Sequence, residues 1–267
     1  MYHTIQRDFF PLHVYLIHIF GDLIAMIKAL GTLGVGAIKP CHACHIEAIC
    51  DIHAKRKTYY LPLTIPGHSK NRLWEILKNP RTHMDYLKTY HRLDIAATEV
   101  ERKRIRKETG IKHPSIFSLL PYFDMGRAVP GGFMHAIYIN LFKALIKLWR
   151  GEFKGLDAGT GNYIIAPPIW AQIGIETRNA VKTVPASFVR SMPNIDSDFG
   201  NFTAEDSAFW MTWLAPYLLA GRLPERYYSH LLELVKIVKI CTGFGIGMKD
   251  HAKLSSDIYE WRLKYEE

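Results

Sequence analysis

The sequence predicts a mainly helical protein with a small β component. Apolar residues recur at helical spacing over residues 133–150, and nearly all of the chain from residue 203 onward has a helical pattern. Two short runs, residues 12–22 and 58–63, are instead rich in β-branched and aromatic residues and end near turn-forming residues. The chain is therefore expected to be helical, with two strand-like segments in its first quarter.

Composition limits the kinds of partner. The 267 residues are 48% hydrophobic, enough to build one large or two small cores, and the formal net charge is +9. A basic protein attracts polyanions, with nucleic acid the commonest and a membrane surface the second. His13, His18, Asp22 and Lys28 interrupt the apolar run 9–30, which argues against a signal peptide or a membrane span. We therefore expect no membrane partner.

The first element is the apolar run 12–22, which has the pattern of a buried strand and ends in Asp22. In α/β sheets the chemistry lies at the carboxyl ends of strands, so Asp22 is a candidate catalytic residue. The next residues, 23–30, have a helical pattern, and Asp is a favoured N-cap. A capping role for Asp22 is the alternative.

The next feature is a Cys/His knuckle. Three of the four cysteines lie within ten residues, which favours a metal site over a disulfide framework and indicates a reducing compartment. Cys41 and Cys44 form a C-x-x-C pair that can supply two of the four ligands of a structural zinc ion. The residues that compete for the other two places are His42, His45, Cys50, His53, His68 and His83.

Among these we favour His68, in a Pro-Gly-His loop, and then His83, at the start of a helix. Two alternatives stay open. The thiols can be reduced and unliganded, or the pair can be redox-active, although redox pairs open a helix after a strand and this one follows Lys39-Pro40 and a Gly-rich loop.

Residues 81–110 have the pattern of a helix that ends at Gly110, a plausible C-cap. Its basic side chains are typical of phosphate contact, which carries no sequence specificity, and a solvated helical face is the alternative. The candidate DNA-binding residues are Arg102, Lys103, Arg104, Arg106 and Lys107.

The remaining elements follow from turn and capping signals. Residues 121–132 are a turn-rich connector, and 133–150 form a core helix that begins near His135. His135 is a weak catalytic candidate, because it could reach toward Asp22, although a lone helical histidine is more often structural. Pro167 precedes another helical stretch, 185–201 is a loop, and helices are expected after the Thr203 cap, over 224–241 and over 250–267.

Several motifs, taken in order, resemble the catalytic region of the CACTA (En/Spm-type) transposases, especially those of mushroom-forming fungi. The first group is Phe20-Gly21-Asp22-Leu23, Pro40-Cys41-His42-Ala43-Cys44, Thr58-Tyr59-Tyr60-Leu61-Pro62-Leu63, Arg81-Thr82-His83 and Gly132-Phe133-Met134-His135. The second group is Leu148-Trp149-Arg150-Gly151-Glu152-Phe153-Lys154-Gly155-Leu156-Asp157, Pro193-Asn194-Ile195, Phe202-Thr203-Ala204-Glu205 and Glu225-Arg226-Tyr227-Tyr228. The resemblance covers essentially the whole chain.

The resemblance implies a partial RNase H-like (DDE-type) core in which three acids hold two magnesium or manganese ions for DNA strand cleavage and transfer. Two ions about 4 Å apart clamp the attacking and leaving oxygens, which one carboxylate cannot arrange. Asp22 is similar to the second acid, and the other two are expected before Met1 and after Glu267. Gly132 stands where the family usually has Asp, and Ile24 where it often has Pro.

The same resemblance implies a division of the chain. Residues 1–36 would be the part of the core that carries Asp22, 37–110 the zinc knuckle insert and basic helix, 111–150 a return to the core, and 151–267 a large helical insertion. It further implies a nuclear protein with transposon-end DNA, and a full-length transposase, as partners. We expect a chain that does not catalyse transposition alone; the alternative is a non-enzymatic, zinc-stabilised nucleic-acid-binding or interaction module.

Overall fold

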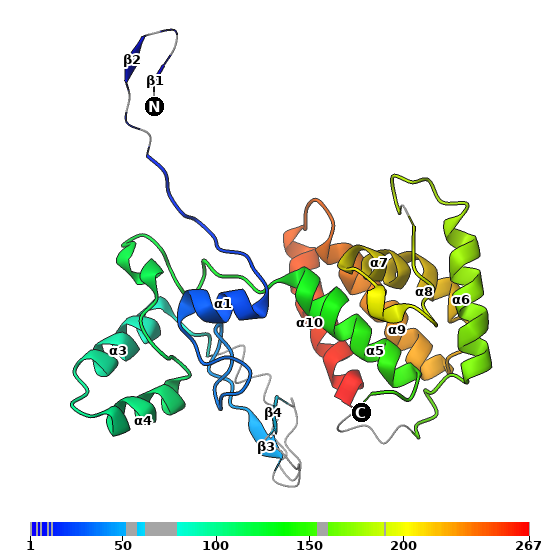
Figure 1. Cartoon of the computed structure of the whole chain (residues 1–267), viewed down its shortest axis with the longest axis horizontal. Helices are drawn as coiled ribbons and strands as arrows, with labels where there is room; N and C mark the ends of the chain where they lie inside the picture. The colour runs from blue at the N-terminus through cyan, green and yellow to red at the C-terminus, as the bar shows by residue number, and fades with distance from the viewer. Residues whose placement is uncertain are drawn as a thin grey trace. The chain divides into compact units, whose positions relative to one another are not determined.

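The computed structural model describes residues 2–3, 5, 7–9, 11, 13–51, 58–61, 79–153, 160–189 and 191–266. It is mainly helical, as predicted, and divides into two compact units, Met1–Gly132 (unit 1) and Phe133–Glu267 (unit 2) (Figure 1). The expected segment 111–150 is therefore shared between the two units. No helix within the described residues is long and apolar enough to cross a membrane.

The strands in the described residues form two short antiparallel hairpins. One pairs β1 (Tyr2–His3) with β2 (Asp8–Phe9), and the other pairs β3 (Ile49–Asp51) with β4 (Thr58–Tyr60). In the second hairpin Cys50 stands opposite Tyr59. The expected strand at residues 58–63 is thus confirmed for its first three residues, and residues 62–63 lie outside the described ones.

The expected strand over residues 12–22 is wrong for the residues that the structure describes. Residues 13–22 are in no strand, and Val14, Tyr15, Ile17 and Phe20 are 62% to 76% exposed. The cross-segment bonds described here are Ile19 N–H to the Ala128 carbonyl (2.9 Å) and Leu16 N–H to the Tyr122 hydroxyl (3.4 Å). A strand needs a full ladder with a neighbour, so the β pattern alone does not make one.

Unit 1 contains helix α1 (Leu23–Leu30), helix α3 (His83–Asp94), helix α4 (Glu99–Thr109) and the 3₁₀ turn η1 (Ile116–Leu119). The expected single helix over 81–110 is two helices, because Thr98 accepts the Glu101 N–H and starts α4 afresh. Gly110 ends α4 with φ 75°, a left-handed conformation that glycine adopts without strain.

The core of unit 1 gathers side chains from α1, α3, α4 and the connector after η1. The Ser115 hydroxyl, in the loop that follows α4, donates to the Ala29 carbonyl in the last turn of α1 (2.6 Å), and a bridge between Thr32 and Ile111 joins that loop to the one that follows α1. The buried residues of this core are Met26, Leu30, Tyr86, Tyr90, Leu93, Ala96, Ile105, Ile111, Phe123, Met125, Ala128 and Val129.

The named elements of unit 2 in its described residues are all helices, and its predicted helices are confirmed within a few residues. Its elements are η2 (His135–Leu141, a π-helix), α5 (Phe142–Trp149), α6 (Pro167–Val181), η3 (Phe199–Asn201), α7 (Ala204–Phe209), η4 (Trp210–Leu214, a π-helix), α8 (Ala215–Leu218), α9 (Glu225–Cys241) and α10 (Met248–Glu266). Thr203 and Asp206 form a capping box, so the predicted cap is confirmed.

The core of unit 2 is larger and rich in aromatic rings. Phe142, Trp170 and Trp210 are at most 2% exposed, and the Trp210 indole N–H donates to the Thr177 hydroxyl (3.0 Å). The long helices α9 and α10 pack side by side, as Figure 1 shows. Because each unit buries its own set of side chains, each has the core that an independent domain requires.

Candidate functional site

The structure brings Cys41 and Cys44 together in a tight turn of unit 1. The Cys44 thiol donates a hydrogen bond to the Cys41 sulfur, and the Ala43 N–H donates to the same sulfur at 3.3 Å. The first of these bonds is the main reason why the pKa of Cys41 is lowered; together with burial it raises the pKa of Cys44. The hydrogen bond between the two sulfurs therefore favours the thiolate form of Cys41 and the thiol form of Cys44.

A buried arginine lies beside this pair. Arg81 is 3% exposed, donates from Nη2 to the Cys41 carbonyl (3.3 Å) and lies over the Tyr86 ring. Its Nε has no partner among the described residues, and no described carboxylate pairs with it. A buried cation without a carboxylate favours negative charge nearby; for Cys44 its charge opposes, without overcoming, the rise in pKa that the Cys41 bond and burial cause.

The histidines near the pair have other partners. The ring nitrogen Nε2 of His42 contacts the Val129 carbonyl (3.0 Å), and that of His45 contacts Asp85 (3.3 Å). Nδ1 of His83 accepts the Met125 N–H at 3.3 Å. His68 lies outside the described residues.

These contacts fit half of a zinc site. Cys41 and Cys44 would supply two sulfur ligands, and Arg81 would balance their charge. The described ranges contain no group of three or more side chains placed to hold one metal ion. Sequence reasoning missed Arg81 as a site residue, because no local pattern shows that the residue before the Thr82 cap lies against the knuckle.

Asp22 acts as the N-cap of α1 in the structure. Its Oδ1 accepts the Ala25 N–H at 2.6 Å, so the alternative interpretation of this residue is confirmed. His135 begins η2 in unit 2 and is half-buried, whereas Asp22 belongs to unit 1. One oxygen of Asp22 is therefore committed to a structural bond.

The basic side chains of α4 divide into paired and unpaired groups. Arg106 pairs with Glu99 (2.7 Å), Arg104 with Glu108 (3.3 Å), and Arg102 lies 3.9 Å from Glu99. Glu108 also binds Arg92, and these arginines lower its pKa. The acids interleaved at helical spacing within this block are the signal that could have predicted the pairing.

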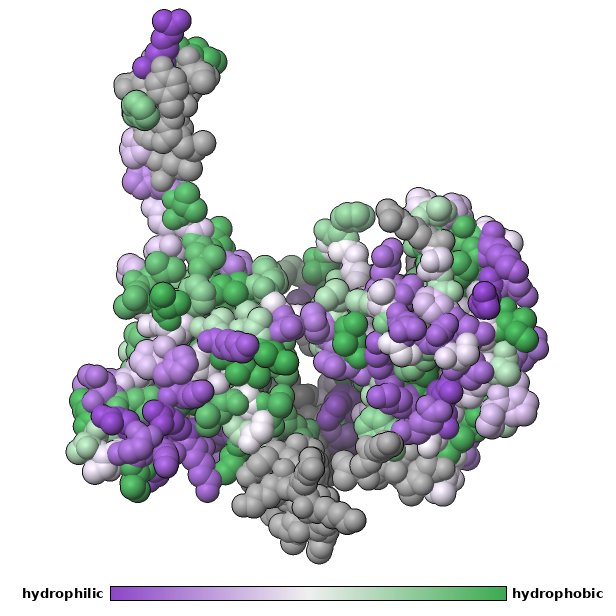
Figure 2. All heavy atoms as spheres, in the orientation of Figure 1, coloured by the Kyte–Doolittle hydropathy of each residue, from purple (hydrophilic) through white to green (hydrophobic). Residues whose placement is uncertain are grey.

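Lys103 and Lys107 are exposed, stand one turn apart and have no described partner. They therefore form the free cationic face of α4. Hydrophilic residues gather over α3 and α4 in Figure 2.

The net positive charge of the protein lies almost wholly in unit 1. Residues 1–132 hold 19 Lys and Arg against 11 Asp and Glu, a formal charge of +8. Residues 133–267 hold 15 against 14, a formal charge of +1. Non-specific attraction for a polyanion is therefore expected of unit 1 and not of unit 2.

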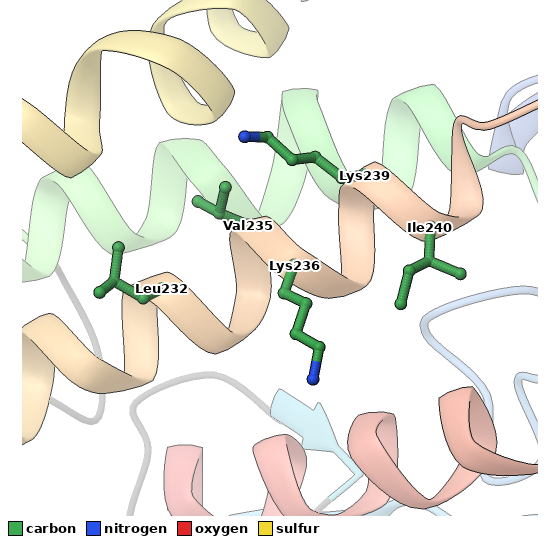
Figure 3. A pocket seen from close by; sticks show the side chains of 5 residues that line it. All are labelled: Leu232, Val235, Lys236, Lys239 and Ile240. Carbon is green, nitrogen blue, oxygen red and sulfur yellow. The ribbon is translucent and has the colours of Figure 1, made fainter. Parts of the chain in front are cut away.

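A cavity in unit 2 runs along one helix. It measures about 450 Å³ and is lined by Leu232, Val235, Lys236, Lys239 and Ile240 of α9 (Figure 3). Lys239 lies over the Trp213 ring at 4.5 Å, and Lys236 lies 3.8 Å from Asp257. Both lysines thus have partners within unit 2, and the groove is otherwise apolar.

No family model matches the chain, and neither does any curated protein or solved structure.

Proposed function

We propose that the chain is a non-enzymatic nucleic-acid-binding protein of CACTA transposase-like descent, in which unit 1 contacts DNA phosphates. The observation that carries the proposal is the charge division, +8 in unit 1 against +1 in unit 2. The free lysines of α4, Lys103 and Lys107, provide phosphate contacts that need no ion pair to be broken.

The resemblance supports DNA over other polyanions. It implies transposon ends as the DNA, the nucleus as the location and a full-length transposase as a further partner. In the nucleus, a transposase-like chain would meet both the transposon ends and the full-length transposase. The RNase H-like core around Asp22 is part of the same proposal and rests on the resemblance alone.

Strand cleavage is the second candidate function, favoured by the place of Asp22 in the resemblance. Two magnesium or manganese ions need several carboxylates to hold them, and they would supply the activation of water and of the phosphodiester. Asp22 is the single acid that the resemblance assigns in this chain, and its Oδ1 already accepts the Ala25 N–H. We therefore propose that the chain binds DNA without cleaving it.

The test is the salt dependence of DNA binding by the full chain. Fluorescence anisotropy with a labelled duplex is measured between 50 and 200 mM salt for wild type and for K103A/K107A. The logarithm of the binding constant falls linearly with the logarithm of the salt concentration, and each lost phosphate contact makes this slope shallower by about 0.9. The double variant is therefore expected to make it shallower by roughly 1.8. A matched control is K249A/K253A, which removes two exposed lysines one turn apart on α10 of unit 2.

The two pairs of lysines separate the outcomes. Contact through α4 would be contradicted if K103A/K107A had the same salt slope as wild type. It would also be contradicted if K103A/K107A and K249A/K253A reduced the steepness of the slope equally. Binding that does not change with salt would contradict the proposal as a whole. Cleavage of the duplex with magnesium or manganese, lost in D22N, would establish the second candidate function instead.

We further propose that zinc stabilises the knuckle through Cys41 and Cys44. Metal analysis of the purified chain is expected to find about one zinc per chain, lost in C41S/C44S. C241S removes an exposed thiol of unit 2 and is expected to keep the zinc. A metal-free wild-type protein that still unfolds cooperatively would show that the pair acts as free thiols.

A further inference from the structure

A second cavity lies between the end of α3, the middle of α4 and the loop after α4. It measures about 260 Å³, whereas a water molecule in the liquid takes about 30 Å³. A phosphate group with several waters therefore fits inside. Its lining residues are Tyr90, Leu93, Asp94, Arg102, Arg106, Lys112, His113 and Pro114.

Two arginines of the lining are held in place by backbone carbonyls. Arg102 donates from Nε to the Leu93 carbonyl (3.4 Å), and Arg106 donates from Nε to the Lys112 carbonyl (3.0 Å). Both side chains are half-buried. Each guanidinium keeps N–H groups beyond these bonds, and fixing Nε in advance reduces the entropy that a ligand must overcome.

The rim of the cavity adds further donors. Lys112 is exposed and its ammonium group has no described partner. The Nδ1 of His113 lies 2.9 Å from the Pro114 carbonyl, which only accepts, so Nδ1 carries the proton and Nε2 of the neutral ring is an acceptor; His113 therefore reports on the cavity without donating to an anion. Three cationic side chains, those of Arg102, Arg106 and Lys112, surround one small space.

Two carboxylates oppose an anion here. Asp94 lines the cavity and is exposed, and Glu99 pairs with Arg106 from outside the lining. Three permanent positive charges, on Arg102, Arg106 and Lys112, exceed these two. The local balance favours a compact anion with several oxygens, and arginine recognises such oxygens in forked geometry.

We propose that this cavity is a phosphate-binding pocket that receives a phosphate group of DNA. The proposal rests on the proposed DNA binding and adds a discrete receptor to it. The source is a backbone diester or a terminal 5′-phosphate, and both present the same phosphate oxygens.

The test uses inorganic phosphate on the full chain. Phosphate is titrated at constant ionic strength, with chloride as the balancing anion, and the imidazole signals of His113 are followed by NMR after assignment with H113Q. We expect D94N to tighten phosphate binding by roughly threefold and K112A to weaken it by a similar factor, the size of an exposed charge interaction. A gain of affinity in D94N cannot come from unfolding.

The matched controls each remove a charge of the same sign from a residue elsewhere in unit 1. E101Q removes an exposed acid of α4, and K88A removes an exposed lysine of α3; neither residue lines the cavity. Both controls are expected to bind phosphate as wild type does. Equal effects of D94N and E101Q, or of K112A and K88A, would overturn the pocket, as would His113 signals that phosphate does not move.

Duplexes with a 5′-phosphate or a 5′-hydroxyl identify the source. Tighter binding of the phosphorylated duplex, lost in K112A, assigns the terminal group, and equal binding that K112A still weakens assigns the backbone. Salt-dependent DNA binding that D94N and K112A leave unchanged overturns the pocket and keeps the proposed function. Phosphate binding without DNA binding keeps the pocket and overturns the proposed function.

Discussion

Short polar side chains decide where the helices of this protein begin. Asp22, Thr82, Thr98 and Thr203 each accept a backbone N–H from the first turn of the helix that follows. Such caps are local, because donor and acceptor lie three residues apart; the sequence analysis identifies those at Asp22 and Thr203 and misses those at Thr82 and Thr98. The catalytic interpretation of Asp22 depended instead on a sheet around it, which no nearby residue can specify.

Gly174 in α6 shows a residue whose role the sequence does not reveal. A Cβ at this position would lie 2.2 Å from Oδ1 of Asn194, the oxygen that accepts the Asp196 N–H. We expect Gly174→Ala to destabilise the protein by about 1–3 kcal/mol, although alanine favours helix by about 1 kcal/mol, because Asn194 must leave its bond. Urea unfolding measures the change.

Gly200 is the matched control. A Cβ there meets nothing within 4 Å, so Gly200→Ala is expected to change stability by less than about 0.5 kcal/mol. A double variant that adds Asn194→Ala to Gly174→Ala should lose less than the sum of the two single changes. Additive losses would contradict the proposed clash.

At the scale of elements, α9 and α10 are joined by a reciprocal contact. The rings of His230 and Trp261 stack at 4.5 Å, the Trp261 indole N–H donates to the His230 carbonyl (3.0 Å), and Nε2 of His230 donates to the Trp261 carbonyl (2.9 Å). Burial lowers the pKa of His230, outweighing the Trp261 carbonyl and Glu233, which raise it; Lys264 and Arg226 lower it further. Burial at this contact therefore favours the neutral ring.

This contact predicts a pH dependence of stability. Because the folded pKa of His230 lies below its ordinary value of 6.5, the unfolded chain binds more protons between the two values. The stabilisation is complete above about pH 6.5 and is lost as the pH falls through the folded pKa. Urea unfolding measures the free energy of unfolding at pH 7.5 and at pH 5.5. The decrease between the two pH values is expected to be smaller for His230→Gln than for wild type.

His251 is the control for this prediction, because it is an exposed histidine of the same helix pair. His251→Gln is expected to keep the pH dependence of wild type. The same pH dependence in His230→Gln and in wild type would show that other groups cause the loss.

At the scale of the whole molecule, core and charge are divided differently. Among the described residues unit 2 has the larger buried core, whereas unit 1 has nearly all of the net positive charge. A net charge of +8 on a small unit costs stability through self-repulsion and attracts polyanions at the same time. We therefore expect unit 2 to be the more stable unit, and the proposed DNA binding to reside in unit 1.

This division predicts the behaviour of residues 133–267 produced alone. Because they bury their own core, we expect cooperative unfolding by circular dichroism, with DNA binding much weaker and less salt-dependent than that of the full chain. A gradual, non-cooperative transition would contradict an independent unit 2. DNA binding equal to that of the full chain would contradict the role of unit 1.

The sequence by itself determined the helical class, the ends of most helices and the presence of a basic helix, because periodicity and capping act over three to four residues. Only the tertiary structure decided that residues 13–22 are in no strand and that Arg81 is buried beside Cys41. Those features depend on which distant segments meet. A strand, a buried charge and a pocket each need partners that local sequence does not specify.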